Sequence, residues 1–166
     1  MADDQRLFEK ICLEGFQSSL SWRTILSKRE NFRKAFKQFD FNKVAKFTEK
    51  DAERLLQNER IVRHEVRLRQ PSIMPNARRR WLSKRVRSRL FFWQYEPEAT
   101  STEPQTISQS SESVALSKAL KKRGWKFVGP TIVYAFMQAM GLVNDHAVGC
   151  DVRTKAIAAR KKFKKP

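Results

Sequence analysis

The sequence has little cysteine, little acid and no long apolar run, and each shortage argues against a class of protein. Its two cysteines, Cys12 and Cys150, lie far apart among 166 residues, which argues against a disulfide-stapled scaffold. No stretch of about 18 apolar residues is available for a bilayer span. The acidic start Met1-Ala2-Asp3-Asp4 does not have the basic and apolar regions of a secretory signal. We therefore expect a cytoplasmic protein without a membrane partner.

Acidic residues are about half as common as basic ones. The 17 Asp and Glu stand against 35 Lys and Arg, and the formal net charge is +18. This excess indicates a polyanionic partner, most simply nucleic acid, with a membrane surface as the competing polyanion. The sequence is nevertheless 40% hydrophobic and contains 12 Phe and 4 Trp, which is enough apolar material to exclude wholesale disorder. At this length we expect one globular domain.

Glycine is also scarce, with five residues, and apolar residues recur at spacings of three and four, which predicts an all-α fold. Caps and turn residues set the expected helix boundaries. The expected helices are one through Leu7, Phe8, Ile11 and Cys12 that stops at Gly15, one from about Ser21 through Phe32, a short one capped by Asp40, one opened by a Thr48 and Asp51 capping box that runs through Leu56, one at Leu116 and Leu120 before a turn at Arg123-Gly124, and one from Pro130 or Thr131 to Gly141. We expect an exposed loop at 96–112 and a basic tail at 151–166.

Two blocks of sequence carry a specific resemblance. The first is LFEKICLEG at 7–15 with LSW at 20–22 and KRENF at 28–32. The second is ALSKALKKRGWKFVG at 115–129 with QAMGLVNDH at 138–146. Together they strongly resemble the bacterial DNA-3-methyladenine glycosylase I family over roughly 7–64 and 91–150. The resemblance implies a helix-hairpin-helix glycosylase-like single domain at 1–150, incomplete here, that flips a damaged base out of duplex DNA and hydrolyses its N-glycosidic bond.

The resemblance also implies two residues that hold the base: Glu14, the catalytic residue, hydrogen-bonds it, and Trp22 stacks on it. A carboxylate accepts from the exocyclic amine and favours a cationic ring, and stacking on an aromatic face contributes about 1–3 kcal/mol per base. Without the family context, a solvated carboxylate at a helix end and a tryptophan in the core are the ordinary interpretations. Eight residues separate the two positions, and Gly15 favours a helix break between them.

His146 and Cys150 are four residues apart, a separation that lets an imidazole and a thiolate on one helical turn bind one ion. The family resemblance implies a structural zinc here, completed by a Cys and a His near the start of the chain. The family's Cys-Gly-Trp opening and its Tyr-His and Glu-Trp-Gly pieces are missing from this sequence. With two ligands in place of four, we expect the zinc to be weakly bound or lost.

The segment 60–90 departs from the family and is a candidate disordered insert, although Trp81, Leu82 and Leu90 offer apolar groups for docking. Deleting one nucleotide from a coding string for the family version yields the residues that follow His64 here. We therefore predict a frameshift near His64 that is restored just before Phe91, with ordinary divergence as the alternative. Arg60 aligns with the glycine of the family's DNA-gripping hairpin, and an arginine disfavours positive φ.

Pro71 and Pro75 interrupt the helix that follows the hairpin in the family. The hairpin is therefore in question, although Arg63 and Arg67 remain able to attract DNA.

The leading interpretation is a monomeric glycosylase that releases 3-methyladenine from alkylated double-stranded DNA. The runner-up is a catalytically impaired remnant with nonspecific DNA binding, and a small basic nucleic-acid-binding module is a remote third. Net charge does not decide among them, because most of it lies outside the family-like blocks. Segment 60–90 has 11 basic residues and 1 acidic residue, and segment 151–166 has 7 and 1.

Overall fold

The structure is a computed structural model that describes residues 3–68, 88–98 and 107–165. These residues form helices and turns and include no strand, which confirms the all-α expectation. The helices are α1 (Asp4–Gln17), α2 (Trp22–Ser27), α3 (Arg29–Ala35), the 3₁₀ turn η1 (Lys37–Phe39), α4 (Phe41–Val44), α5 (Glu49–Leu56), α6 (Glu65–Leu68), α8 (Ser88–Trp93), α9 (Ser111–Lys122), α10 (Pro130–Met140) and α11 (Asp151–Lys162). No helix of these ranges is both long enough and apolar enough for a bilayer span.

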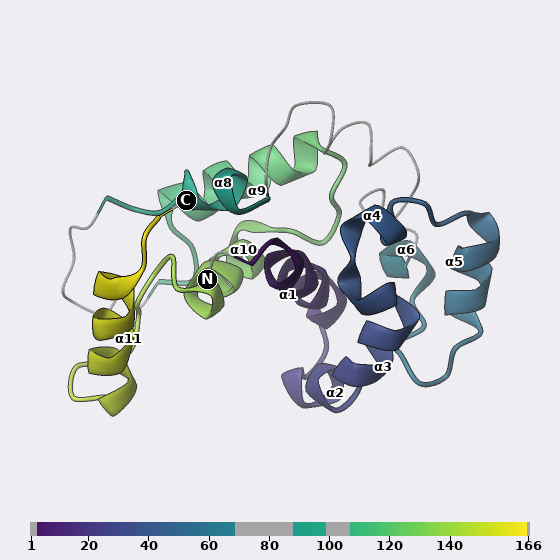
Figure 1. Cartoon of the computed structure of the whole chain (residues 1–166), viewed down its shortest axis with the longest axis horizontal. Helices are drawn as coiled ribbons and strands as arrows, with labels where there is room; N and C mark the ends of the chain where they lie inside the picture. The colour runs from purple at the N-terminus through teal and green to yellow at the C-terminus, as the bar shows by residue number, and fades with distance from the viewer. Residues whose placement is uncertain (1–2, 69–87, 99–106, 166) are drawn as a thin grey trace.

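Helix α1 lies at the centre of the fold. Figure 1 shows it between α8 to α11 on one side and α2 to α6 on the other, and it packs directly against α10, α8, α2 and η1. Its side chains are therefore buried around most of its circumference, with Leu7 and Ile11 fully inaccessible to solvent. A residue on this helix is held by packing from both halves of the protein, which is the rigidity that a binding site requires.

The first helix continues past the glycine at which we expected it to stop. Helix α1 runs through Gly15 to Gln17, and the N–H of Ser18 then bonds to the carbonyl of Glu14. A glycine inside a helix costs about 1 kcal/mol relative to alanine. Burial of Phe16, whose ring stacks on Phe32 at a centroid distance of 5.0 Å, outweighs that cost. The expectation of a stop at Gly15 was wrong because tertiary packing decides this boundary.

The helix expected from Ser21 through Phe32 is two helices. Ser21 caps α2, and its side chain accepts from the N–H of Arg23. Lys28, with φ −101° and ψ 3°, leaves helical geometry, and α3 begins directly after it. The bend lets Ile25 and Phe32 both reach the core, where neither is exposed. The two short helices thus bury both side chains, which one straight helix would have placed along a single axis.

Several local signals gave the correct boundaries. The Asp40 side chain accepts from two backbone N–H groups at the start of α4, and Thr48 with Asp51 forms the expected capping box of α5. Gly141 ends α10 with φ +78°, a left-handed conformation that favours glycine. These boundaries depend on contacts within a few residues, so the sequence alone specifies them.

The segment 151–166, expected as a basic tail, forms helix α11 over most of its length. Asp151 lies in the first turn and Arg160 in the last, the arrangement that the helix dipole favours. The Phe163 ring contacts Trp93 of α8 at 4.6 Å between centroids, and Arg160 bonds to Glu96. The end of the chain is therefore docked on the body of the protein.

The turn between α5 and α6 occupies the position of the questioned hairpin. Arg60 does not take a positive φ; its N–H donates to Asn58 Oδ1 at 3.0 Å, and Ile61 beside it is buried. The chain turns here and α5 packs on α6, because an Asn side chain supplies a turn that needs no glycine. The doubt about the DNA-gripping hairpin stays a prediction. Pro71, Pro75 and most of the predicted frameshifted segment lie outside the described residues.

Candidate base-binding site

Glu14 lies in the last turn of α1 and is buried, with 1% of its surface exposed. Its Oε1 receives the Lys10 ammonium at 2.9 Å. Its Oε2 is also buried and has no hydrogen-bond partner among the residues that the structure describes. An ionised oxygen without a partner in such a place carries an energetic penalty that a ligand donor can relieve.

Trp22 begins α2 and lies across the same ammonium. A tight turn connects α1 to α2, with Ser19 at φ +63°, and it returns the chain toward α1. The half-buried Trp22 ring is 3.9 Å from Lys10 Nζ, measured to the ring centroid. Glu14 and Trp22 thus meet around one cation. The break expected between them is present, three residues later than predicted.

Burial governs the electrostatics of Glu14. Removal from water raises the pKa of its carboxyl above the ordinary value, and the Lys10 ammonium opposes part of that rise. The site therefore favours a positive charge near the carboxylate. Together with the aromatic face of Trp22, it has the features that suit a flat, cationic, hydrogen-bond-donating ligand.

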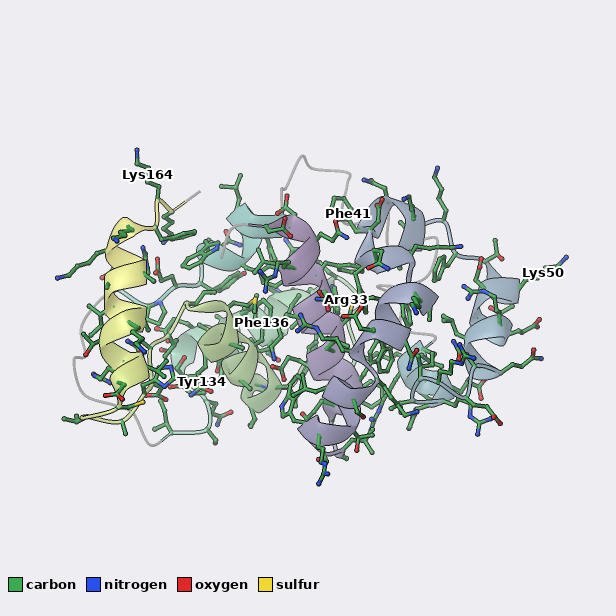
Figure 2. The ribbon with its side chains drawn as sticks, turned by 60° about the horizontal axis from the view of Figure 1, so that its bottom comes forward. Arg33, Phe41, Lys50, Tyr134, Phe136 and Lys164 are labelled. Atoms are coloured by element: carbon green, nitrogen blue, oxygen red, sulfur yellow. The ribbon has the colours of Figure 1, made fainter. Side chains whose placement is uncertain are left out.

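A second glutamate on α1 fixes the helix in place. Glu9 is 5% exposed and accepts from Arg29 Nε at 2.7 Å and from Arg33 Nε at 2.8 Å and Nη2 at 3.1 Å. Figure 2 shows Arg33 beside the α1 ribbon. Burial raises the pKa of Glu9, but the hydrogen bonds and positive charges of the two arginines lower it by a larger amount, so the net pKa is below the ordinary value. This network ties α1 to α3 next to the candidate site.

His146 and Cys150 come together, though not on a helical turn as expected. They lie in the connection between α10 and α11, where Gly149 has φ +83°, and Cys150 Sγ is 4.0 Å from His146 Nδ1. No group of three or more His, Cys, Asp or Glu in the described ranges is placed to hold a metal ion. A closed structural zinc site takes four ligands, so the described residues do not fit one.

A groove of about 1120 Å³ separates α11 from α10. Its polar lining includes Asp145, which accepts from the Tyr134 hydroxyl at 2.8 Å, and His146. Burial raises the pKa of Tyr134, and the Asp145 carboxylate adds to the rise. In Figure 2 Tyr134 lies toward α11, whereas Arg33 lies beside α1. Glu14 and Trp22 do not line this groove.

The basic residues near the α5–α6 turn differ in their access to DNA. Arg63 is exposed. Arg67 is 7% exposed, and its Nη1 donates to the carbonyl of Phe16 at 2.8 Å while its guanidinium lies over the Phe127 ring. The expectation that Arg67 attracts DNA was wrong, because its side chain caps the end of α1 inside the protein.

Lys10 is the residue of this site that the sequence analysis missed. A Lys four residues before a Glu on a predicted helix is a signal for an ion pair, so its contact with Glu14 was open to prediction. Its position over Trp22 was not, because that contact depends on the turn that brings α2 back to α1.

Comparison with known proteins finds similar sequences and structures. A family model described as methyladenine glycosylase matches residues 1–154. DNA-3-methyladenine glycosylase 1 of Escherichia coli (strain K12) is 50% identical in an alignment over 156 residues, and the match covers 89% of this chain and 82% of that protein. DNA-3-methyladenine glycosylase of Haemophilus influenzae is 44% identical in an alignment over 159 residues, and the match covers 92% of this chain and 85% of that protein. A solved structure of 3-methyladenine DNA glycosylase I from Staphylococcus aureus, which concerns its recognition of 3-methyladenine, matches with a TM-score of 0.82 at 32% identity and covers 92% of this chain and 84% of that chain.

Proposed function

The chain belongs to the methyladenine glycosylase family, and we propose that it hydrolyses the N-glycosidic bond of 3-methyladenine in alkylated double-stranded DNA, a base excision repair reaction. The observation that carries the proposal is the juxtaposition of a buried carboxylate, Glu14, with the face of Trp22 around a single positive charge. A methylated adenine flipped out of the duplex presents the same features: a flat ring, a positive charge and an exocyclic amine.

The charge of the damaged base explains why so small a site suffices. The bond between the sugar C1′ and the base nitrogen breaks with its electron pair going to the cationic base, which leaves as a neutral molecule. Water supplies the hydroxyl group at C1′ and releases one proton to solvent. Because the leaving group needs no protonation, the protein has to extract, orient and recognise the base rather than supply a strong acid.

Each residue has a definite part in this scheme. Glu14 accepts a hydrogen bond from the exocyclic amine through Oε2, the oxygen that lacks a partner in the described part of the chain. Trp22 supplies the stacking surface, worth about 1–3 kcal/mol for one base. The Glu9 network with Arg29 and Arg33 is a positioning element, because it holds α1 without forming part of the Glu14–Trp22 pair.

Zinc has no part in this reaction scheme. His146 and Cys150 supply two donors, and two donors give far weaker binding than the four of a closed site. The proposal is that any zinc on this pair is weakly held. Metal analysis of the purified protein after dialysis should find well under one equivalent, and a full, tightly bound equivalent would show that further ligands exist.

The competing function is nonspecific DNA binding by an impaired member of the family. The observation in its favour is the run of 11 basic residues between positions 60 and 90, which favours phosphate attraction without base selection.

We also propose that the glycosylase acts as a monomer in the cytoplasm. Its substrate class, DNA, supports that location. Gel filtration of the free protein tests the monomeric state.

Release of free 3-methyladenine from methylated DNA tests the proposed activity. The wild-type chain should release the base at enzyme concentrations that leave undamaged DNA intact. Glu14→Gln should release it at least a hundredfold more slowly while binding undamaged DNA as well as wild type. No release by wild type at any enzyme concentration, with DNA binding retained, would exclude the glycosylase and leave the competing function.

A further inference from the structure

Lys10 is a charged residue of the proposed site for which the excision reaction has no use. Its side chain is 21% exposed, its Nζ is 2.9 Å from Glu14 Oε1, and the same atom is 3.9 Å from the Trp22 centroid. The proposed function assigns the same carboxylate, through its other oxygen Oε2, and the same ring to the cationic base. One positive charge already occupies the place where another must enter.

We propose that Lys10 is a resident cation of the base site: it lies between Glu14 and Trp22 in the free protein, leaves when the methylated base enters, and returns when the base has been released. The inference rests on the proposed function, since it requires that Glu14 and Trp22 hold the base.

The two cations cannot both keep their best positions. An ammonium directly over the Trp22 ring occupies the layer in which a stacked base would lie. Two positive charges beside one carboxylate also repel each other, and the repulsion is strong where water is excluded. Entry of the base therefore requires the ammonium to move away from the tryptophan ring.

Lys10 has a way out. Part of its side chain already reaches solvent, its four-carbon stem is flexible, and its ammonium is strongly hydrated once exposed. Glu14 keeps Oε2 free of other described partners, so an arriving amine can bond to the carboxylate before the ammonium leaves. Exchange of one cation for the other need not leave the buried carboxylate without a partner.

The chemistry gives the exchange a direction. The base is a cation while it is attached to the sugar, and it becomes neutral when the glycosidic bond breaks. A neutral base loses its charge attraction to Glu14, whereas Lys10 keeps its own. Displacing Lys10 costs the same free energy for substrate and product, but the neutral product gains less from Glu14 to offset that cost, so Lys10 returns more readily against the product and promotes its release.

Binding of free 3-methyladenine to the intact chain tests this proposal. We expect Lys10→Met, which keeps the length of the side chain without its charge, to bind the base about tenfold more tightly than wild type by calorimetry. Lys10→Arg should bind like wild type, because a cation remains. Lys118→Met is the matched control: it removes an exposed lysine from another helix and should change nothing.

Multiple-turnover excision supplies the second readout. Lys10→Met should show a burst of released base followed by a slower steady rate, because product leaves more slowly. Lys10→Leu provides a second neutral variant if Lys10→Met folds poorly, as judged by circular dichroism.

The outcomes separate this proposal from the proposed function. Equal or weaker binding of the base by both neutral variants, with Glu14→Gln weaker than wild type, overturns the role of Lys10 and leaves the base site in place. If neither wild type nor any variant binds the base or releases it from DNA, the proposed function itself fails, and the role of Lys10 fails with it.

Discussion

Two glutamates on α1 should respond in opposite directions to the same substitution. Glu9 and Glu14 are both buried, at 5% and 1% exposure, and both lie on one helix. They differ in their partners, since Glu9 accepts from two arginines whereas Glu14 is paired with one lysine and keeps one oxygen unpaired. Replacement by glutamine removes the charge while nearly preserving the shape, so it isolates the electrostatic difference.

Glu9→Gln should destabilise the protein. The carboxylate receives three N–H···O bonds from Arg29 and Arg33, whose side chains are 35% and 28% exposed. A glutamine amide accepts through one oxygen and places an N–H₂ group against a guanidinium. Breaking a buried pair from one side costs about 3–5 kcal/mol, and partial exposure of the arginines reduces this to about 2–3 kcal/mol. The melting temperature should fall by roughly 5–10 °C.

Glu14→Gln should leave stability unchanged or increase it by about 1 kcal/mol. The substitution removes a charge whose burial a single lysine, 21% exposed, compensates in part. The released Lys10 ammonium can reach water, so no stranded cation offsets the gain. Since the same variant loses excision activity, Glu14 is a residue whose function is maintained at the expense of stability.

Acid should diminish both effects, for opposite reasons. The pKa of Glu9 is lowered in the folded protein, so its contribution is complete above the unfolded value of 4.5 and is lost as the pH falls through the folded pKa. The pKa of Glu14 is raised by burial, so its penalty exists above that raised pKa and vanishes as the pH falls below 4.5. The destabilisation by Glu9→Gln and the gain from Glu14→Gln should both shrink in acid.

Urea unfolding followed by circular dichroism, repeated between about pH 4 and pH 8, measures both free energies. Glu53→Gln on α5 is the control: its side chain is exposed, and the change should stay within about 0.5 kcal/mol. A Glu14→Gln protein that is less stable than wild type by more than about 1 kcal/mol would refute the argument, because Glu14 would then be a net stabilising ion pair. Equal losses for Glu9→Gln and Glu53→Gln would refute the arginine network.

Two other pairs of substitutions test the fold and the DNA surface. Arg67→Met should lower the free energy of unfolding by about 2 kcal/mol, because the Phe16 carbonyl loses its donor, with DNA affinity unchanged; Arg63→Met, at an exposed position, should weaken DNA binding measured at low salt and leave stability alone. Gly141→Ala should cost about 1 kcal/mol in thermal unfolding, because φ is +78° there, whereas Gly129→Ala meets no atom within 4 Å at an ordinary negative φ and should be close to neutral. Equal costs at the two glycines would contradict the strain argument.

The helix boundaries that sequence could predict are those fixed by near neighbours. Asp40, the Thr48 and Asp51 box, and the Pro130-to-Gly141 span each need contacts within one turn. Gly15 was misjudged because its environment comes from elsewhere: α10, α8 and η1 enclose α1, and burial of Phe16 stabilises a helix that local propensity would end. At Lys28 the opposite error occurred: a continuous helix was expected, and nothing in the lysine side chain indicates the bend that packing imposes there.

The same distinction between local signals and contacts of distant residues applies to the candidate site. Family resemblance pointed to Glu14 and Trp22, and the spacing of Lys10 and Glu14 was a local signal that went unused. The burial of Arg67 was not open to prediction, because its partner Phe16 lies 51 residues earlier in the chain. Basic residues look alike in a sequence, and only their tertiary partners separate an arginine that caps a helix inside the protein from one that faces solvent.

The position of Lys10 joins the stability of the protein to its affinity for the base. A carboxylate buried beside an aromatic ring needs a cation, and the structure places Lys10 there in the absence of substrate. The measured affinity for the base is therefore a difference between two cations, and it falls short of what Glu14 and Trp22 would supply alone. A chain that lost Lys10 should bind the base more tightly and, without base, should hold Glu14 at a still higher pKa, because the ammonium is the group that lowers it. Nuclear magnetic resonance titration of the Glu14 carboxyl in Lys10→Met measures that pKa directly, and a pKa equal to or below the wild-type value would show that the two charges are not coupled.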